Sequence, residues 1–318
     1  MNNIVSFFKL VRLKNLIIVA LTQLIIKFSL INPFLDNFML SNNQFYLLVL
    51  ATIFITASGY IINDIYDVKT DIVNKEKDII IGKSITSRNA ITWYILFNVF
   101  GLGLGLYIAY IVQKPLYSLI FLYCIFSLWT YSIRMKTSFI FGNLQVSLLT
   151  ALSLFNVALF DIIPNEITKN YAEMRVFKII VFYAAFAFII TFIREIIKDL
   201  EDIKGDKKIQ AKTLAITYGT EKTKWVSIIF TILTFLGIAY FQYFQYSKLS
   251  SEYDIPIWGA NRVAMIYTIF IQFLFLFLGF KIYTSKLKND FYFISQLCKI
   301  IMIVGILSIP LFTYLYQN

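Results

Sequence analysis

Long apolar stretches separated by short polar segments run through the whole chain. An α-helix needs about 20 apolar residues to cross a hydrocarbon core about 30 Å thick, and nine stretches of the sequence approach that length. Strands of a membrane β-barrel would instead appear as short segments of alternating polarity. We therefore predict an all-α, polytopic membrane protein with its helices bundled around a central cavity. The expected spans are residues 15–34, 44–63, 90–112, 115–133, 139–161, 177–197, 225–245, 262–283 and 294–315.

The composition agrees with one membrane-embedded unit. Hydrophobic residues make up 59% of the chain and charged residues 15%, whereas soluble domains carry about 25% charged residues. No polar linker, low-complexity segment or repeat interrupts the pattern, so we expect residues 1–318 to form a single integral-membrane domain. Residues 2–14 are basic but lack a small-residue cleavage site, so we expect no cleavable signal peptide.

Lysine and arginine are distributed unevenly between the two sides of the predicted bundle. With the N-terminus in the cytoplasm, 21 of the 29 basic residues fall in cytoplasmic segments and 5 on the other side. The positive-inside rule then predicts a cytoplasmic N-terminus and a C-terminus outside. Loops that face anionic lipid explain the net charge of +11, and we expect no nucleic-acid partner. Lys27 and Lys299 lie within predicted spans, where we expect each to snorkel or to face a polar cavity.

The residue types exclude several kinds of site. The sequence has no histidine, and its two cysteines, Cys124 and Cys298, lie far apart in apolar runs. These facts argue against histidine catalysis, a Cys-x-x-Cys site and a disulfide framework. A bound metal would need oxygen ligands, which favours a hard cation such as Mg²⁺.

Ten of the 18 acidic residues fall in two short windows. Each window follows an even-numbered span, so both lie on the cytoplasmic side of the predicted topology. The windows contain Asp64, Asp67, Asp71, Glu76 and Asp78, and Glu195, Asp199, Glu201, Asp202 and Asp206.

Helical spacing gathers most of these acids into two stripes. At about 100° per residue, Asp64, Asp67 and Asp71 share a face about 60° wide, and Glu195 shares a similar face with three aspartates of the second window. Like charges three or four residues apart repel, so a solvated loop with scattered acids explains the repeated pattern poorly. Two facing stripes would form a carboxylate-lined mouth suited to Mg²⁺ bridged by a phosphate-rich ligand. The ligand spacing and the glycine of an EF-hand are absent.

Basic residues lie among and beside the acids. A diphosphate needs cationic donors as well as metal, and this mouth would open into an aromatic-rich apolar bundle. Together these features predict a substrate with a diphosphate head and a hydrocarbon tail, such as an isoprenyl diphosphate. The basic residues concerned are Lys69, Lys75, Lys77, Arg134, Lys136, Arg194 and Lys198.

Three motifs resemble those of the UbiA-type intramembrane prenyltransferases. The resemblance extends from Arg12 to about Gly219, and it implies nine helices with active-site loops after the second and sixth. Two of the motifs are similar to the family's aspartate motifs and one to its YSxxxK loop. They are Asn63-Asp64-x-x-Asp67-x-x-x-Asp71, Asp199-x-x-Asp202-x-x-x-Asp206 and Tyr131-Ser132-x-x-x-Lys136.

Within this family, residues 57–64 and 194–199 are most similar to the digeranylgeranylglyceryl phosphate synthase branch. The resemblance implies a geranylgeranyl diphosphate donor, geranylgeranylglyceryl phosphate as a lipid-like acceptor, and a bacterial or archaeal cell membrane as the location. One segment departs from the family pattern. Residues 74–79 lack the proline of its KPxRP-like sequence, and Lys77 stands where arginine is common.

The resemblance also implies roles for individual residues. Mg²⁺ held by aspartates would bind the donor diphosphate, and Arg194, Lys198, Lys75 and Lys136 would add charge-assisted hydrogen bonds that stabilise its charge as the C–O bond breaks. Tyr60, Tyr66 or Tyr131 would shield the allylic cation. The expected catalytic and metal-binding residues are Asp64, Asp67, Asp71, Asp199, Asp202 and Asp206. The expected substrate-binding residues are Asn63, Lys75, Tyr131, Arg134, Lys136, Arg194 and Lys198.

Two alternatives stay open at this point. The acceptor could be an aromatic acid of quinone biosynthesis, such as 4-hydroxybenzoate or dihydroxynaphthoate, because the motifs do not separate the acceptors. A transporter with a cytoplasmic cation site is the alternative from another class, although ionisable groups through the midplane and internal repeats are not evident. The DGxxAR-type pattern of phospholipid head-group transferases is absent.

Overall fold

The structure is a computed structural model that describes residues 3–74, 79–165, 171–248 and 261–318. In these residues the fold is all-α, without strands, which confirms the predicted fold class. The helices are α1 (Asn3–Leu10), α2 (Leu13–Ile26), α3 (Asn32–Phe34), α4 (Asn42–Asn74), α5 (Ser87–Ile111), α6 (Leu119–Ile133), α7 (Phe141–Asp161), α8 (Tyr171–Lys208), α9 (Leu214–Lys248), α10 (Arg262–Thr284) and α11 (Lys288–Gln317). Short 3₁₀ or π-helical turns are η1 (Lys27–Ile31), η3 (Pro115–Ser118), η4 (Met135–Thr137) and η5 (Ile163–Asn165).

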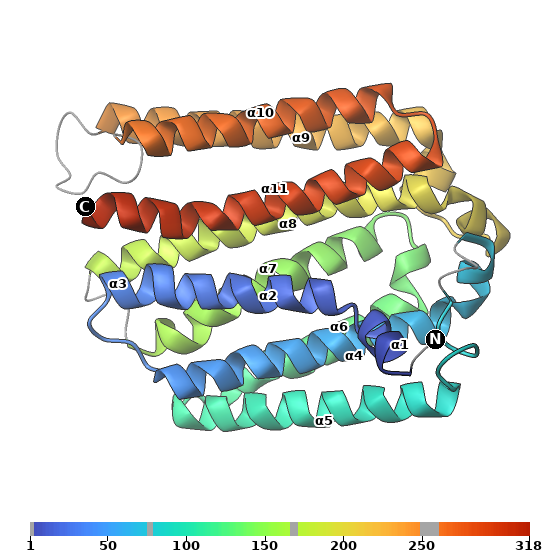
Figure 1. Ribbon diagram of the computed structural model, residues 1–318, viewed down its shortest axis with the longest axis horizontal. Coiled ribbons are helices and arrows are strands. Elements are labelled where there is room, and N and C mark those ends of the chain that lie inside the picture. The colour runs from blue at the N-terminus through green and yellow to red at the C-terminus, as the bar shows by residue number, and fades with distance from the viewer. Residues whose placement is uncertain (1–2, 75–78, 166–170, 249–260) are drawn as a thin grey trace.

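Nine helical segments in the described residues are long and apolar enough to cross a membrane, and each corresponds to a predicted span. Successive spans run in alternating directions, so the two termini lie at opposite ends of the bundle (Figure 1). Large apolar side chains, including Val99 and Phe100 on α5 and Ile229 on α9, are exposed. Such exposure is expected of surfaces that face lipid rather than water.

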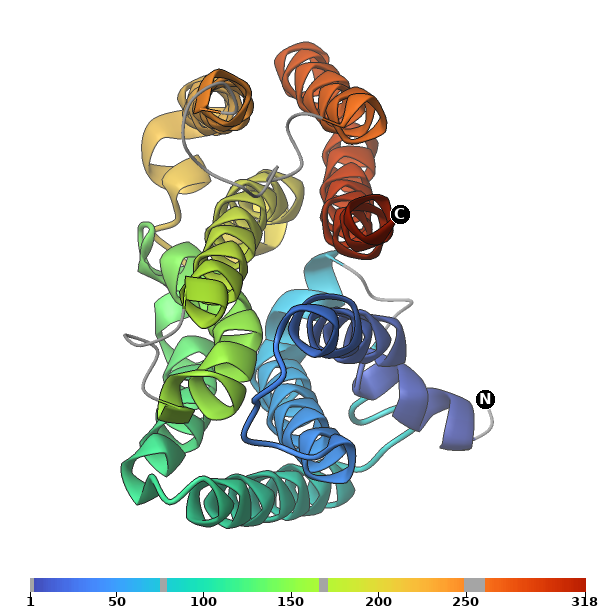
Figure 2. The ribbon, with the colours of Figure 1, turned by 90° about the vertical axis from the view of Figure 1, so that its left-hand side faces the viewer.

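Two large apolar cores, with two smaller buried clusters, hold the described helices together. One is centred on α2, α4 and α7 and includes the fully buried rings of Phe45 and Phe160. The other joins α8 to the last three helices and includes Phe275 and Ile301. Viewed along the helices, α8 lies near the middle, with α9 and α10 beyond it on one side and α5 on the far side (Figure 2).

Helices α4 and α8 extend well past the hydrocarbon core. They contain 33 and 38 residues. At 1.5 Å per residue they are therefore about 50 and about 57 Å long, against a core of about 30 Å. Their last turns carry Asp64, Asp67 and Asp71 of the first acidic window and the whole second window, at the same end of the bundle as the N-terminus (Figure 1). The acids therefore lie on continuous helix, as the angular spacing of the stripes requires.

A buried ion pair joins η1, which continues α2, to α7 at the other end of the bundle. Lys27 Nζ lies 2.6 Å from Asp161 Oδ2, and neither side chain is exposed. Asp161 Oδ1 also accepts a hydrogen bond from the Leu40 backbone N–H at 2.8 Å, and the Phe38 ring centroid lies 3.8 Å from Lys27 Nζ. The prediction that Lys27 snorkels or faces a polar cavity is therefore wrong. Its partner lies 134 residues away in sequence, so no local pattern indicates the pair.

Replacing Lys27 with Met should destabilise the protein by about 3–5 kcal/mol, because the change leaves the Asp161 carboxylate buried without its cation. Adding Asp161→Asn should recover much of this loss, since the neutral amide oxygen can still accept from the Leu40 N–H. Thermal unfolding in detergent, followed by circular dichroism, measures both effects. Lys14→Met, at an exposed position of α2, is the matched control. Equal stability of Lys27→Met and the wild type would contradict the stabilising role of the pair.

Candidate active site

A cavity of about 850 Å³ opens at the end of the bundle that carries the acidic windows. Its walls come from α2, α4, α6, α7, α8 and α11. The cavity extends from the aspartates to Phe121 and Asn156, in the distant halves of α6 and α7. Apolar groups such as Ile55 and Leu149 line its inner part. The cavity therefore combines a charged mouth with a long interior that can accept a hydrocarbon chain.

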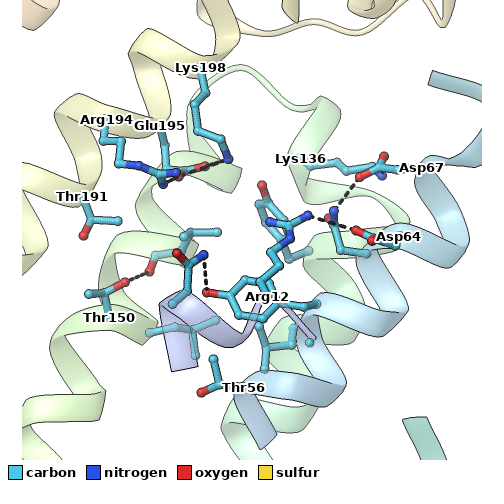
Figure 3. Close-up of a pocket in the computed structure, with 18 of the residues that line it drawn as sticks. Arg12, Thr56, Asp64, Asp67, Lys136, Thr150, Thr191, Arg194, Glu195 and Lys198 are labelled. Atoms are coloured by element: carbon cyan, nitrogen blue, oxygen red, sulfur yellow. Dashed lines mark hydrogen bonds and ion pairs between the residues drawn. The ribbon is translucent and has the colours of Figure 1, made fainter. Parts of the chain in front are cut away.

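Basic side chains pair with the first aspartate motif, on α4. Arg12 Nη2 donates to Asp64 Oδ1 at 2.9 Å, and Lys136 Nζ forms an ion pair with Asp67 (Figure 3). Asn63 Nδ2 donates to the other carboxylate oxygen of Asp67 at 2.6 Å. Charge on α4 is thus partly balanced by residues that are distant in sequence.

Arg12 reaches Asp64 because the chain turns sharply between α1 and α2. Its backbone adopts the left-handed conformation, with φ 51°, which is uncommon for a residue other than glycine. Its guanidinium lies 4.8 Å from the centroid of the Tyr60 ring, one helical turn before Asp64. Burial lowers the pKa of Arg12, but the charge and hydrogen bond of Asp64 together with Tyr60 and Asp67 outweigh that effect and raise the pKa above its ordinary value. Arg12 is therefore a permanent cation at the mouth.

The second aspartate motif faces the first from α8. Asp206 interacts electrostatically with Asp67 of α4 as well as with Asp202 on its own helix. Asn143 of α7 donates to Asp199 Oδ2 at 2.9 Å. The two predicted stripes therefore converge on one cavity.

The turn between α6 and α7 holds Lys136 against this region. Gly142 permits the tight turn, because a Cβ at this position would lie 2.6 Å from the Met135 backbone oxygen. The backbone N–H of Lys212, just after α8, donates to the Thr137 oxygen at 2.8 Å. This bond links the Lys136 turn to the segment that follows the second motif.

A second charged group lies on α8, about one turn before the second motif. Arg194 Nη1 donates to Glu195 Oε1 at 2.5 Å, and Lys198 Nζ lies 3.3 Å from Glu195 Oε2. Figure 3 shows Arg194, Glu195 and Lys198 on one side of the cavity and Asp64 on the other, with Arg12 between them. Tyr131 lies among these charges and also lines the cavity.

The donor set suits a hard divalent cation. All six aspartates of the two motifs line the same cavity, and the nearby ligands are oxygens. Among the described residues, no three carboxylates are close enough to hold an ion by themselves. Mg²⁺ commonly binds through one or two carboxylates together with substrate phosphates and water, so the residues fit Mg²⁺ delivered with a phosphorylated substrate.

Most of the site residues expected from sequence line this cavity. The exceptions are Arg134, which is exposed and lies outside the lining, and Lys75, which lies outside the described residues, as do Glu76, Lys77 and Asp78. The side chain of Lys69 is likewise not described. Tyr66 is 46% exposed and does not line the cavity. The residues found in it are Asn63, Asp64, Asp67, Asp71, Tyr131, Lys136, Arg194, Lys198, Asp199, Asp202 and Asp206.

Sequence reasoning missed residues that line the cavity or contact its aspartates. Arg12 counted only as a topology determinant, and Asn143 carried no signal because its contact with Asp199 is tertiary. Lys299 lines the cavity, which agrees with the expectation that it would either snorkel or face a polar cavity. Its charge within an apolar run was the signal that could have placed it in the site.

Comparisons with known proteins agree with this geometry. The sequence profile described as the UbiA prenyltransferase family matches residues 34–286. The chain is 29% identical over 253 residues to the digeranylgeranylglyceryl phosphate synthase of Methanosphaera stadtmanae, covering 80% of this chain and 82% of that protein.

Two solved structures share the fold. One comes from a study of digeranylgeranylglyceryl phosphate synthase in membranes, with a TM-score of 0.63, 22% identity, and coverage of 98% of this chain and 99% of that one. The other is a UbiA homologue from Archaeoglobus fulgidus bound to GPP and Mg²⁺, with a TM-score of 0.58, 17% identity, and coverage of 96% and 99%. The family match covers most of this chain, and the chain belongs to the UbiA prenyltransferase family.

Proposed function

We propose that this prenyltransferase transfers a geranylgeranyl group from its diphosphate to geranylgeranylglyceryl phosphate, in an Mg²⁺-dependent reaction inside the membrane. The observation that carries the proposal is the convergence of two aspartate stripes on one cavity with a long interior. The name of the relative from Methanosphaera stadtmanae supports the acceptor, and the GPP and Mg²⁺ bound to the Archaeoglobus fulgidus homologue support the donor class and the metal.

The six aspartates would hold Mg²⁺, which supplies positive charge that neutralises the diphosphate as it leaves. Asp64 and Asp67 from α4 face Asp206 from α8, so the two helices present carboxylates from opposite sides. An Mg²⁺ ion that also binds substrate phosphate needs only one or two carboxylate ligands. The carboxylates on α4 and α8 would therefore be enough to hold it.

Arg12 and Lys136 would stabilise the leaving diphosphate directly. Each now pairs with an aspartate of the first motif, so each already lies at the mouth. Guanidinium and ammonium groups form strong charge-assisted hydrogen bonds to phosphate oxygens. As the donor C–O bond breaks, its electron pair stays on the diphosphate, and these donors stabilise the growing charge.

The allylic cation would then react with the acceptor hydroxyl. Tyr60 and Tyr131 line the cavity and present aromatic faces, and a ring can stabilise a nearby cation by about 0.5–2 kcal/mol. The acceptor oxygen forms the new C–O bond, and its proton passes to the released diphosphate or to an aspartate. No stronger base is needed, because the hydroxyl proton is lost as the ether forms.

We further propose a cytoplasmic mouth and N-terminus, a C-terminus outside, and a bacterial or archaeal cell membrane as the location. The bias of lysine and arginine toward the N-terminal side supports the orientation. On this side the mouth meets water-soluble Mg²⁺ and releases diphosphate, while the cavity interior receives the hydrocarbon chains. We also propose that residues 1–318 act as one domain, because the cavity draws on helices from α2 to α11.

The acceptor assignment is tested by competition. Equal concentrations of geranylgeranylglyceryl phosphate and 4-hydroxybenzoate, with one labelled geranylgeranyl diphosphate, should give label almost entirely on the glycerol lipid. Chromatography separates the two products. Label only on the aromatic ring would overturn the acceptor while leaving the prenyltransferase assignment in place.

Removal of divalent metal should abolish turnover. Excess chelator is expected to lower diphosphate release to background, and added Mg²⁺ should restore it, because the clustered ligands at the mouth are carboxylates. Release of diphosphate from a prenyl diphosphate in detergent measures the effect. Full turnover in excess chelator would rule out the metal-assisted mechanism.

Asp67→Asn and Asp202→Asn should each lower kcat by about 100-fold or more, because each removes a charge from the proposed metal site. Both variants should remain folded, since loss of one acid relieves repulsion within its stripe. Asp36→Asn, at an exposed position far from the cavity, is the matched control and should retain full activity. Wild-type kcat in either site variant would contradict the assignment.

A further inference from the structure

Lys299 places a positive charge deep in the wall of the cavity. It lies on α11, more than two turns inside the helix, and is partly buried. Its Nζ donates to Asn15 Oδ1 at 3.4 Å, and its charged neighbours include Arg194, Lys198 and Glu195. We call Arg194, Lys198 and Lys299 the α8–α11 basic cluster.

Two polar atoms next to this cluster lack partners. Within the part of the chain that the structure describes, neither Thr191 Oγ1 nor Arg194 Nε has a hydrogen-bond partner, although both atoms are buried. Thr191 is only 3% exposed and lines the cavity one helical turn before Glu195. Leaving a buried polar group without a partner is unfavourable, so both atoms indicate a polar ligand at this wall.

The cluster carries more positive charge than its own carboxylate balances. Arg194 and Lys198 pair with Glu195, Lys299 lies near these three charges, and Asp199 on the same helix interacts with Glu195 and Lys198, so three cations stand against two carboxylates. Cations gathered in a partly buried wall repel one another unless an anion lies between them. A phosphate monoester carries about −1.5 to −2 near pH 7 and three acceptor oxygens, so it can accept from several of these donors at once.

The position of the cluster separates it from the donor site. Arg194 lies across the cavity from Asp64 and Asp67 (Figure 3), whereas Lys198 adjoins Asp199 of the second motif and so lies nearer the donor diphosphate. Lys299 approaches from α11, which carries none of the aspartates of the two motifs. Two anions can therefore bind on opposite walls, with the reacting carbon and the hydroxyl between them.

We propose that the α8–α11 basic cluster, with Thr191 beside it, binds the phosphate group of the acceptor lipid. This inference rests on the proposed function and assigns the acceptor half of the site. Lys299 and Arg194 donate to the phosphate oxygens, and the Thr191 hydroxyl and Arg194 Nε gain the partners that they lack. The wall would thereby select a phosphorylated glycerol lipid over the same lipid without phosphate.

Binding of the acceptor in the presence of chelator tests the proposal without relying on turnover. Isothermal titration of the full chain in detergent should show that the wild type binds geranylgeranylglyceryl phosphate more tightly than geranylgeranylglycerol. Lys299→Met should weaken binding of the phosphorylated lipid by about 10- to 100-fold, the usual effect of losing a charge-assisted hydrogen bond. Thr191→Val should weaken it by about fivefold or more, and Lys299→Arg should retain most of the affinity.

Kinetics separate the acceptor from the donor. With Mg²⁺ present, Lys299→Met should raise the acceptor KM by about the same factor and change the donor KM by less than about twofold. Lys286→Met, on an exposed loop before α11, should leave both values unchanged.

A raised donor KM with an unchanged acceptor KM would overturn the proposal, as would wild-type affinity in both Lys299→Met and Thr191→Val. If either result is found while the wild-type protein still converts geranylgeranylglyceryl phosphate, only the proposed phosphate subsite is overturned. Absence of that turnover in the wild type would instead overturn the proposed acceptor.

Discussion

Repulsion between carboxylates on α4 and α8 is the constraint on which the site depends. Two helices end in acidic stripes that face each other across one cavity, and without compensation they would push apart. The protein supplies part of the compensation itself, through Arg12 at Asp64 and Lys136 at Asp67. These contacts draw the N-terminal turn and the α6–α7 turn toward the mouth. A divalent cation with a diphosphate would complete the balance, so binding and assembly of the site are coupled.

The membrane-spanning architecture could be predicted from sequence because length and apolarity determine it. Nine apolar runs long enough to cross the bilayer correspond to nine helical segments of spanning length in the described residues, and the 3.6-residue period predicted which faces carry the acids. What sequence could not give was the partner of a buried charge. Lys27 was expected to snorkel or to face a polar cavity, yet its ion pair with Asp161 depends on how η1 packs against α7.

Site residues that belong to a sequence motif could be predicted, whereas residues that reach the site only through tertiary packing could not. Asp64 and Asp199 stand in patterns that repeat, whereas Asn143 is a single polar residue whose importance comes from its position opposite Asp199. Arg134 was a wrong prediction of the opposite kind. Its position two residues before Lys136 suggested a substrate contact, but its side chain is exposed and does not line the cavity. Charge within an apolar run, as at Lys299, is the signal that sequence offers for such tertiary roles.

The central claim is that α4 and α8 together hold divalent metal at the mouth of the cavity. Anomalous diffraction from crystals grown with Mn²⁺ and a non-hydrolysable prenyl thiodiphosphate would test it most directly, because Mn²⁺ takes the same oxygen ligands as Mg²⁺ and its position can be located independently. The account predicts metal peaks within coordination distance of aspartates from both helices and of the diphosphate oxygens. Diphosphate bound in the cavity with no metal peak at either stripe would contradict it.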